Sequence, residues 1–528
     1  MPELSQVDRK ASPPLINIPR QYNAAHDLIE RNLSAGRGGK AAVIDDHGRY
    51  SYQDLADRAN RVANALTAAG VLQEQRILLC VHDTFDFPCT FLGAIKAGIV
   101  PVAVNTLLTQ GDYEYMLTDS RAVVAVVSYA LLPLFEPLLG RVPTLKRIIV
   151  AGAPESRPDS LAAFVKDAAS TFAPVNTTCD DPCFWLYSSG STGAPKGTVH
   201  VHSSLVQTAE LFAVPMLGIN EQDVVFSAAK LFFAYGLGNG LTFPMAVGAT
   251  AVLMAERPTP DATFKRMVEH RPSIFYGAPT GYAGMLASPN LPKRSDVALR
   301  LCSSAGEALP EDIGKRWHAH FGVDIIDGIG STEMLHVFLS NKVGDVRYGT
   351  TGKPVPGYEV RLVGDEGQLV GPGEPGELQV KGPTAAACYW NNRGKSRSTF
   401  LGEWTRSGDK YTVTADGYYI YSGRNDDMLK VSGIYVSPIE VESVLITHES
   451  VLEAAVVGQE DVDKLIKPKA YVVLKPGIEA TPELADALKA HVKAHLAPYK
   501  YPRWFDFVAE LPKTATGKIQ RFKLRANA

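Results

Sequence analysis

Cysteine is scarce in this sequence, and its few thiols form no recognisable metal site. The 528 residues include six cysteines, and none of them belongs to a CxxC pair. Cys179 and Cys183 stand four residues apart, but no matching group of histidines or cysteines completes a zinc site. We therefore expect reduced thiols that act as small hydrophobic side chains, and no catalytic cysteine.

Long apolar runs are also missing. The longest, residues 122–135, is interrupted by Ser128, Tyr129 and Pro133, whereas a helix needs about 20 apolar residues to span a bilayer. Residues 1–8 contain neither a basic start nor an apolar segment, so they do not resemble a secretory signal. We expect a cytoplasmic protein that does not bind membranes.

No excess of positive charge is present either. The formal net charge is -3 at pH 7, which argues against nucleic-acid binding through a broad basic surface but leaves room for a local anion site. Hydrophobic residues make up 45% of the chain and charged residues 21%, which is ordinary for a globular protein. A chain of this length is expected to fold into about two to four units.

The middle of the chain has the pattern of an α/β protein. Ser51, followed three residues later by Asp54, predicts the start of a helix that continues through Leu66, and Gly70 suits its end. Short apolar runs that alternate with helical segments predict parallel strands joined by crossover helices. Strands are expected at residues 77–81, 100–104, 123–127 and 148–150.

The pattern changes in the last third of the chain. Residues 358–363 and 377–380 look like strands of hairpins within a region rich in Gly and Pro. Further on, a helix is predicted to begin after Thr481, which would act as its N-cap. We therefore predict a large domain of residues 1–425 and a small α+β domain of residues 426–528.

The most informative segment is a stretch rich in glycine and hydroxyl groups, YSSGSTGAPKG, which runs from Tyr187 to Gly197 after the apolar residues 184–186. Glycines allow the backbone to curl so that several N–H groups face one anion, and Lys196 adds a positive charge. The alternative is a solvated linker, but a linker rarely follows a buried strand directly. We predict a polyphosphate site with the candidate residues Ser188, Ser189, Gly190, Ser191, Thr192, Gly193 and Lys196.

Two familiar nucleotide-binding motifs do not fit. Lys196 is preceded by Pro195 and followed by Gly197, whereas the P-loop of NTPases places Ser or Thr after its lysine. The glycines of residues 236–240 and 328–330 miss the GxGxxG spacing of dinucleotide-binding folds. The loop therefore belongs to another class of phosphate site.

Residues 187–197 resemble the phosphate loop of the adenylate-forming superfamily, which includes acyl- and aryl-CoA synthetases, luciferases and nonribosomal peptide adenylation domains. Further motifs occur in the family's order between about residues 50 and 521. The resemblance implies a large N-terminal domain of several subdomains that binds ATP and the acid, and a small mobile C-terminal lid. It also implies ATP, Mg²⁺ and coenzyme A as reactants and cofactors.

Two more motifs resemble the nucleotide-binding parts of that family. Residues 303–310 look like its adenine-binding strand and turn, although alone they would pass for an ordinary tight turn. Residues 327–333 look like the motif in which Thr332 contacts phosphate and Glu333 ligates Mg²⁺, and one carboxylate beside phosphate oxygens suffices for that ion. The implied ATP contacts are Ala305, Gly306, Glu307, Asp327, Gly328, Ile329 and Thr332.

Later motifs complete the implied machinery. By resemblance, Asp409 accepts hydrogen bonds from the ribose hydroxyls and Arg424 assists, although a surface ion pair is the plainer explanation. Lys518 matches the family's catalytic lysine, acting with Lys196, Thr332 and Glu333, and its ammonium would offset negative charge as the acid attacks ATP. A solvated terminal lysine is the alternative.

The resemblance also implies a rotation of the small domain between two half-reactions. Asp426 stands at the family's hinge position, where a few residues absorb the change in backbone angles. After rotation, Ser432 and Gly433 would face the pantetheine arm of coenzyme A, although Gly433 could equally be a turn glycine.

The acid is expected to bind between these motifs. Tyr235 could form an aromatic wall, and His336 could donate a hydrogen bond to the carboxylate of the acid or simply be a core histidine. The candidate acyl-binding residues are Ala234, Tyr235, Gly236, Gly277, Gly330 and His336.

The segments 230–239 and 332–336 look closest to the benzoate and hydroxybenzoate coenzyme A ligases. We therefore favour benzoate, or a small ring-substituted benzoate, converted to its coenzyme A thioester with release of AMP and pyrophosphate. Other aryl, alicyclic or medium-chain acids, the loading of a carrier protein, a luciferase-like oxygenase and a non-catalytic nucleotide sensor are the alternatives. A monomer or a homodimer is expected.

Overall fold

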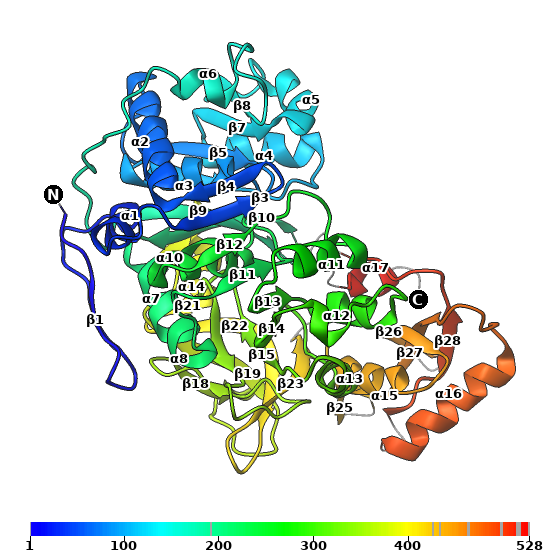
Figure 1. The fold of residues 1–528 in the computed structure, drawn as a ribbon. Coiled ribbons are helices and arrows are strands. Elements are labelled where there is room, and N and C mark those ends of the chain that lie inside the picture. Colours follow the sequence, from blue (N-terminus) through cyan, green and yellow to red (C-terminus); the bar gives the residue numbers. More distant parts are fainter. Residues whose placement is uncertain are drawn as a thin grey trace.

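Two large β-sheets form the centre of the N-terminal part of the chain (Figure 1). The structure is a computed structural model that describes residues 2–190, 193–424, 427–431, 434–461, 465–496, 500–513 and 519–525. The first sheet has seven strands, parallel from β8 to β9, with β10 and β20 antiparallel at one edge. In spatial order they are β8 (Arg147–Ala151), β7 (Val124–Ser128), β5 (Arg76–Cys80), β6 (Val100–Ala103), β9 (Pro182–Gly190), β10 (Gly193–Val201) and β20 (Cys388–Tyr389).

The second sheet has nine strands and a parallel centre. Its strands from β3 to β15 run parallel, while β4, β16 and β17 extend the two edges in the antiparallel sense. In spatial order they are β17 (Lys353–Pro354), β16 (Val337–Ser340), β15 (Ile325–Gly330), β14 (Leu301–Ala305), β13 (Ile274–Gly277), β11 (Val224–Ser227), β12 (Thr250–Val252), β3 (Ala41–Asp45) and β4 (Gly48–Ser51).

Helices cover both sheets and supply the crossover connections. Those that accompany the first sheet are α2 (Tyr52–Ala68), α3 (Asp86–Lys96), α4 (Gln110–Ser120), η1 (Tyr129–Leu131), α5 (Leu132–Phe135), η2 (Glu136–Leu138) and α6 (Leu161–Val165). Those that accompany the second are α1 (Ala24–Ser34), α7 (Ser203–Thr208), η3 (Ala209–Ala213), α8 (Val214–Leu217), α9 (Ala234–Leu237), η4 (Gly238–Thr242), α10 (Phe243–Val247), α11 (Pro260–Glu269), α12 (Pro279–Ala287), η5 (Arg294–Asp296) and α13 (Glu311–Phe321). Of these, η3 and η4 are π-helical turns.

The remaining elements form smaller sheets. A five-stranded antiparallel sheet follows the large ones, and beyond residue 427 a hairpin and a three-stranded sheet pack with two longer helices in a core of their own. The five-stranded sheet and its helix comprise β18 (Glu359–Val363), β19 (Gly376–Lys381), α14 (Arg393–Thr399), β21 (Phe400–Leu401), β22 (Trp404–Val413) and β23 (Tyr419–Arg424). The last part comprises β24 (Leu429–Val431), β25 (Ile434–Val436), α15 (Pro438–Ile446), β26 (Val451–Glu460), β27 (Ile466–Leu474), α16 (Pro482–His495), β28 (Trp504–Phe507) and α17 (Arg521–Arg525).

The local predictions from the sequence are confirmed where they rest on capping and strand patterns. The Ser51 hydroxyl accepts from the backbone N–H of Asp54, whose carboxylate accepts from the backbone N–H of Ser51, so helix α2 begins with the predicted capping box. Thr481 likewise accepts from the backbone N–H of Leu484 at the start of α16. The four predicted strands of the α/β region correspond to β5, β6, β7 and β8 within one residue at most of their ends.

Close packing joins the helices on the first sheet. Gly93 of α3 lies against α2, where an added Cβ atom would come within 2.6 Å of the Ala59 carbonyl oxygen. Leu55, Val62 and Phe91 are among the fully buried side chains of this core. A larger residue at position 93 would therefore push the two helices apart.

The extent of the two predicted domains stays a prediction, because residues 425 and 426 lie outside the described residues. Figure 1 shows the elements beyond residue 427 (orange to red) on one side of the molecule, next to α12 and α13. Within the described residues, every helix is too short or too polar to cross a lipid bilayer.

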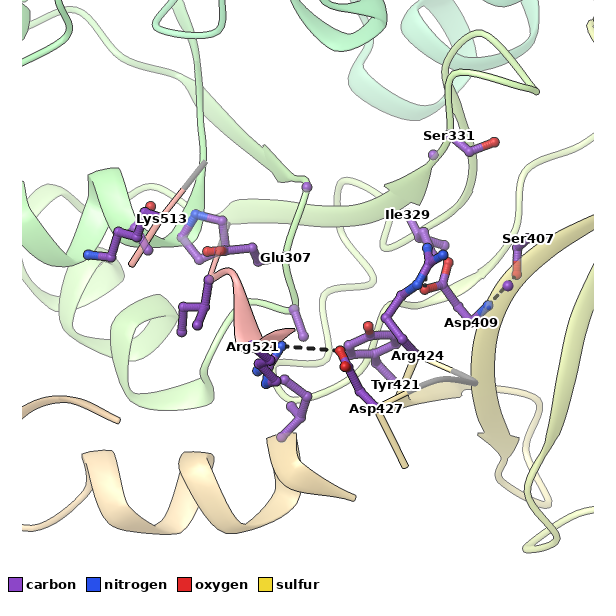
Figure 2. A pocket seen from close by; sticks show the side chains of 18 of the residues that line it. Glu307, Ile329, Ser331, Ser407, Asp409, Tyr421, Arg424, Asp427, Lys513 and Arg521 are labelled. Carbon is purple, nitrogen blue, oxygen red and sulfur yellow. Dashed lines mark hydrogen bonds and ion pairs between the residues drawn. The ribbon is translucent and has the colours of Figure 1, made fainter. Parts of the chain in front are cut away.

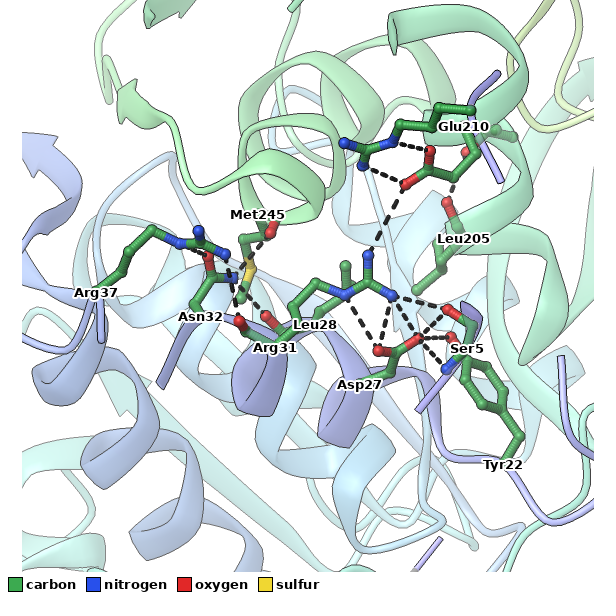
Figure 3. A network of polar contacts seen from close by, with 12 residues as sticks. Ser5, Tyr22, Asp27, Leu28, Arg31, Asn32, Arg37, Leu205, Glu210 and Met245 are labelled. Atoms are coloured by element: carbon green, nitrogen blue, oxygen red, sulfur yellow. Dashed lines mark hydrogen bonds and ion pairs between the residues drawn. The ribbon is translucent and has the colours of Figure 1, made fainter. Parts of the chain in front are cut away.

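A buried polar network holds the N-terminal residues against the core (Figure 3). The hairpin of β1 (Gln6–Asp8) and β2 (Leu15–Asn17) places Arg9 so that its guanidinium donates two hydrogen bonds of 2.8 Å to Glu210, whose side chain is fully buried in the π-helical turn η3. Arg31 of α1 donates to Asp27 at 2.7 Å and lies 3.8 Å from Glu210. The two arginines therefore compensate two buried carboxylates.

We expect that Arg31→Met lowers the free energy of unfolding by about 3 kcal/mol or more, because it leaves the 1% exposed carboxylate of Asp27 without its cation. The matched control is Arg316→Met, which breaks the i,i+4 pair with Asp312 on an exposed surface and is expected to cost about 1 kcal/mol or less. Denaturant unfolding curves measure both, and equal losses would contradict the stabilising role of the buried network.

Candidate active site

A cavity of about 1660 Å³ lies where the phosphate loop, the second sheet, the five-stranded sheet and the C-terminal elements meet. Figure 2 shows the part of its wall that includes Ile329, Asp409 and Arg521. Residues far apart in the sequence line it together. The predicted site residues among them are Ser188, Lys196, Gly306, Glu307, Asp327, Gly328, Ile329, Gly330, Thr332, Glu333, Asp409 and Arg424. The structure therefore brings most of the predicted nucleotide site into one place.

Several predicted residues fall elsewhere or are not described. Ser191, Thr192, Asp426, Ser432, Gly433 and Lys518 lie outside the described residues, so their roles stay predictions. Ser189, Gly190 and Gly193 lie in the hairpin of β9 and β10, and Ala305 ends strand β14. The acyl candidates Ala234, Tyr235, Gly236, Gly277 and His336 do not line the large cavity.

The described residues of the phosphate loop belong to the antiparallel strands β9 and β10. Lys196 of β10 pairs with Ser188 of β9, so these two residues stand opposite each other on neighbouring strands. Tyr115 of α4 supports this hairpin, because its hydroxyl donates to the Pro195 carbonyl at 3.0 Å. On the edge of β10 that pairs with β20, the backbone N–H of Trp390 donates to the Gly197 carbonyl at 2.7 Å, and its indole N–H donates to the Asp119 carbonyl on α4 at 2.9 Å.

Lys196 is half-buried and lies over an aromatic ring. Its ammonium is 4.7 Å from the ring centroid of Tyr389, a cation–π contact. Burial lowers the pKa of Lys196, and the nearby carboxylate of Glu333 partly offsets this shift. The ammonium is therefore only weakly compensated within the protein and suits an anionic ligand.

The segment after β15 carries Thr332 and Glu333. The Thr332 carbonyl accepts a hydrogen bond of 2.7 Å from Nε2 of His200, a buried residue whose pKa is lowered to about 4 by burial. A carbonyl can only accept, so Nε2 carries the proton of this neutral imidazole. One oxygen of Glu333, Oε1, accepts from the Tyr389 hydroxyl at 2.6 Å.

Tyr389 and His200 were missed by the sequence analysis. Tyr389 belongs to a strand of two residues and lies far along the chain from both Lys196 and Glu333. The pair Tyr389–Trp390 after a Gly-Pro segment was the only local signal, and such aromatic pairs are usual in protein cores. Only the pairing of β20 with β10 reveals the contact.

Asp327 is a buried carboxyl group at the cavity. Its Oδ2 accepts a long hydrogen bond of 3.4 Å from the backbone N–H of Leu309, which links β15 to the turn after β14. Its Oδ1, like the Ser188 hydroxyl, has no hydrogen-bond partner in the part of the chain that the structure describes. Burial raises the pKa of Asp327 to about 8. These two buried atoms are available to a ligand.

The predicted ribose-binding residues lie on paired strands. Asp409 of β22 stands opposite Arg424 of β23, and the guanidinium approaches the carboxylate to 3.3 Å (Figure 2). Gly408 has a φ of +77°, and a Cβ atom there would meet the Arg424 side chain at 3.0 Å. The carboxylate of Asp409 is thus held at the cavity wall by its neighbour.

Two of the acyl candidates, Tyr235 and His336, belong to an aromatic cluster, with ring centroids 5.4 Å apart. His336 is 3% exposed and packs against Phe243 and Phe212 with ring centroids 4.5 Å and 5.3 Å away. Its Nε2 lies 3.3 Å from the Tyr235 carbonyl, and burial lowers its pKa to about 3, so the ring is neutral. Donation to a carboxylate from the same N–H would require this contact to break, and the predicted role of His336 stays untested.

At two positions in this cluster, only glycine fits, because a side chain would collide with a neighbouring carbonyl group. A Cβ atom on Gly330 would come within 2.5 Å of the His336 carbonyl oxygen, and one on Gly236 within 2.0 Å of the Lys230 carbonyl oxygen. The π-helical turns η3 and η4 carry Phe212 and Asn239 respectively, and such turns occur often at functional sites. The cluster is therefore tightly packed and shaped by backbone irregularities.

Two models of related protein families match successive parts of the chain. The model of the AMP-binding enzyme family matches residues 30–390, and that of the AMP-binding enzyme C-terminal domain matches residues 440–518. A benzoate–CoA ligase of Thauera aromatica is 66% identical, with 99% of both chains covered. A 4-hydroxybenzoate–CoA/benzoate–CoA ligase of Rhodopseudomonas palustris is 52% identical, with 96% of this chain and 94% of that one covered.

Solved structures show the same fold. A benzoate CoA ligase from Burkholderia xenovorans has a TM-score of 0.90 and 58% identity, covering 96% of this chain and 100% of its own. An anthranilate CoA ligase in complex with anthranoyl-AMP has a TM-score of 0.93 and 45% identity, covering 97% and 98%.

We expect Asp327→Asn to remove a pH dependence of stability. The pKa of Asp327 is about 8 in the folded chain and about 3.9 when unfolded, so the folded state holds one proton more between these values. The contribution of the Asp327 carboxyl group to the free energy of unfolding is fully present below about pH 4. As the pH rises from there to about 8, this contribution falls by up to about 1.4 kcal/mol per pH unit. Asn carries no titrating group, so the free energy of unfolding of the variant should rise relative to that of the natural protein as the pH increases.

Urea unfolding at pH 5, 6.5 and 8 without nucleotide measures this difference. Asp312→Asn, on an exposed part of α13, is the control and should show no such trend. A constant difference between Asp327→Asn and the natural protein at all three pH values would show that Asp327 is ionised throughout.

Proposed function

This chain belongs to the AMP-binding enzyme family and has the adenylate-forming enzyme fold, and we propose from this that it joins benzoate, or a small ring-substituted benzoate, to coenzyme A. It is an acid–thiol ligase that consumes ATP and forms AMP, pyrophosphate and the acyl thioester through an acyl adenylate. The observation that carries the proposal is one cavity lined by Lys196, Glu333 and Ser188, whose hydroxyl has no hydrogen-bond partner among the described residues.

The first half-reaction forms the acyl adenylate. An oxygen of the acid attacks the α-phosphorus of ATP, the bond to the β-phosphate breaks, and pyrophosphate leaves. Lys196 and the hairpin N–H groups are proposed to bind the β- and γ-phosphates, and Asp409 to accept hydrogen bonds from the ribose, because Lys196 and Asp409 line the same cavity. The chain thus contributes mainly positioning and compensation of charge.

In the second half-reaction, the thiol of coenzyme A attacks the acyl carbon, and AMP leaves with the electrons of the broken acyl–oxygen bond. Asp426 is proposed as the hinge for the rotation between the two steps, and Ser432 and Gly433 as contacts of the pantetheine arm. Lys518 is proposed to contact the acid and the α-phosphate only in the first step.

Glu333 is proposed to hold Mg²⁺ together with the phosphates. Among the described residues, no group of three or more His, Cys, Asp or Glu side chains could hold a metal ion alone. One carboxylate plus phosphate oxygens fits the preference of Mg²⁺. Bound there, the ion would neutralise phosphate charge.

Benzoate is favoured because Tyr235 and His336, two of the acyl candidates, belong to an uncharged aromatic cluster. Tyr235 donates to the Ser303 hydroxyl at 3.1 Å and its ring packs edge-on against Tyr276. His336 is neutral at physiological pH. A flat, uncharged ring suits such surroundings better than a flexible chain or a charged substituent does.

A panel of acids in a pyrophosphate-release assay tests this proposal. We expect kcat/KM for benzoate to exceed that for hexanoate and cyclohexanecarboxylate by about tenfold or more, as typical of discrimination by a shaped pocket. The products must be AMP and benzoyl-CoA with free coenzyme A as acceptor. Preference for a fatty acid, or transfer only to a carrier protein, would overturn the substrate assignment.

The two half-reactions separate the role of Lys518. We expect Lys518→Ala to slow benzoate-dependent pyrophosphate exchange by roughly 100-fold or more, the usual cost of losing one group that compensates developing charge. Thioester formation from supplied benzoyl-AMP should stay nearly unchanged. Lys523→Ala, a nearby lysine in α17, should affect neither step, and an equal loss of both steps in Lys518→Ala would disprove the assignment.

A further inference from the structure

One side chain contacts both opposite charges of the phosphate site. Tyr389 of β20 lines the cavity, is 3% exposed and pairs with Thr198, two residues beyond Lys196 on β10. Its hydroxyl donates to Oε1 of Glu333 at 2.6 Å, and its ring faces the Lys196 ammonium at 4.7 Å. The side chain of Tyr389 therefore contacts both the cation and the anion.

Direct contact between these two charges would be unfavourable for function. Opposite charges about 4 Å apart near a protein surface attract each other by about 4 kcal/mol. A Lys196–Glu333 ion pair would occupy the ammonium that an incoming phosphate requires. Both residues are described by the structure, and each contacts Tyr389 rather than forming an ion pair with the other.

The contacts with Tyr389 leave both groups ready for a ligand. The hydroxyl occupies one oxygen of Glu333 and leaves the other, Oε2, for a cation. A cation–π contact near the surface is worth about 0.5–1 kcal/mol, so a phosphate can replace it at little cost.

Tyr389 is itself held firmly. Its backbone N–H donates to the Ser396 hydroxyl at 3.0 Å, and its ring packs against Phe400 with centroids 5.3 Å apart. The backbone of Glu333 is tied to the same segment, because its carbonyl accepts from the N–H of Ala386 at 2.7 Å. Tyr389 and Glu333 therefore have a fixed relative position.

We propose that Tyr389 is a positioning residue that keeps Lys196 and Glu333 apart and orients the free oxygen of Glu333 toward the metal–nucleotide complex. This inference rests on the proposed function, because it assigns phosphate binding to Lys196 and Mg²⁺ binding to Glu333. Tyr389 itself forms no bond to a reacting atom. Its two contacts act separately, the hydroxyl on Glu333 and the ring on Lys196.

Two substitutions separate these contacts. Tyr389→Phe removes only the hydroxyl, so the affinity for a non-hydrolysable ATP analogue without Mg²⁺ should stay unchanged, while the gain in affinity on adding Mg²⁺ should shrink roughly tenfold. Tyr389→Leu removes the ring as well, so Lys196 can pair with Glu333 and the affinity without Mg²⁺ should also fall. Calorimetry on the full-length protein measures these affinities.

A double substitution distinguishes positioning from a merely structural role. In Tyr389→Leu combined with Glu333→Gln, no carboxylate remains to pair with Lys196, so the Mg²⁺-free affinity should recover to the level of Glu333→Gln alone. A structural defect would persist in the double variant. Tyr358→Phe, which removes another buried hydroxyl bonded to Thr384, is the control and should leave the Mg²⁺-dependent gain unchanged.

The proposal is overturned if Tyr389→Phe shows the full Mg²⁺-dependent gain, or if it loses affinity equally with and without Mg²⁺. Should Tyr389→Leu fail to fold, Tyr389→Phe decides alone. These binding measurements need no carboxylic acid substrate. The proposed function is tested separately, by benzoate-dependent pyrophosphate exchange with the natural protein, so the two proposals can fail independently. Thioester formation from supplied benzoyl-AMP should be unchanged in Tyr389→Phe.

Discussion

The structure has to keep opposite charges close together in a half-buried cleft without allowing them to neutralise one another. A polyphosphate needs cations, and the ion that accompanies it needs a carboxylate, so both must be present before the ligand arrives. For Lys196, Glu333 and Asp327, the chain meets this constraint with uncharged partners, whereas Asp409 forms an ion pair with Arg424. Glu333 is bonded to the hydroxyl of Tyr389, Asp327 to the backbone N–H of Leu309, and Lys196 lies over a ring. Each partner is weak enough to be exchanged or to leave an oxygen free.

The topology supplies these partners from distant parts of the sequence. Strand β10 pairs with β9, which continues the parallel strands, and also with β20, which arrives nearly two hundred residues later in the chain. The loop after β15 reaches the same point, where His200 of β10 holds the Thr332 carbonyl. The described strands of the phosphate hairpin are thus bonded both to β20 and to the loop after β15. Elsewhere in the fold, the arginine network of the N-terminal residues stabilises the π-helical turn η3, because Arg9 and Arg31 both lie next to Glu210.

Sequence reasoning succeeded where the determining interactions are local. The Ser51–Asp54 capping box, the Thr481 cap and the parallel strands depend on residues a few positions apart, and they were predicted within one residue or so. The ATP-binding motifs were found because each is a short segment with its own composition. Tyr389 and His200 could not be found this way, since their importance arises only from strand pairing across the fold. The shape of the acyl cluster could not be predicted either, because the π-helical turns η3 and η4 have no distinct sequence pattern.

The neutral partners also leave the ammonium of Lys196 available to a nucleotide, although the cleft contains charged side chains of both signs. If Lys196 and Glu333 formed a direct ion pair in the empty cleft, nucleotide binding would first have to break an attraction of about 4 kcal/mol. That amount corresponds to about a thousandfold in affinity. Replacing a cation–π contact costs about 1 kcal/mol or less, so most of the attraction between ammonium and phosphate remains available for binding. A neutral Asp327 acts in the same direction, because at physiological pH it adds little negative charge to a cleft that must accept a polyanion.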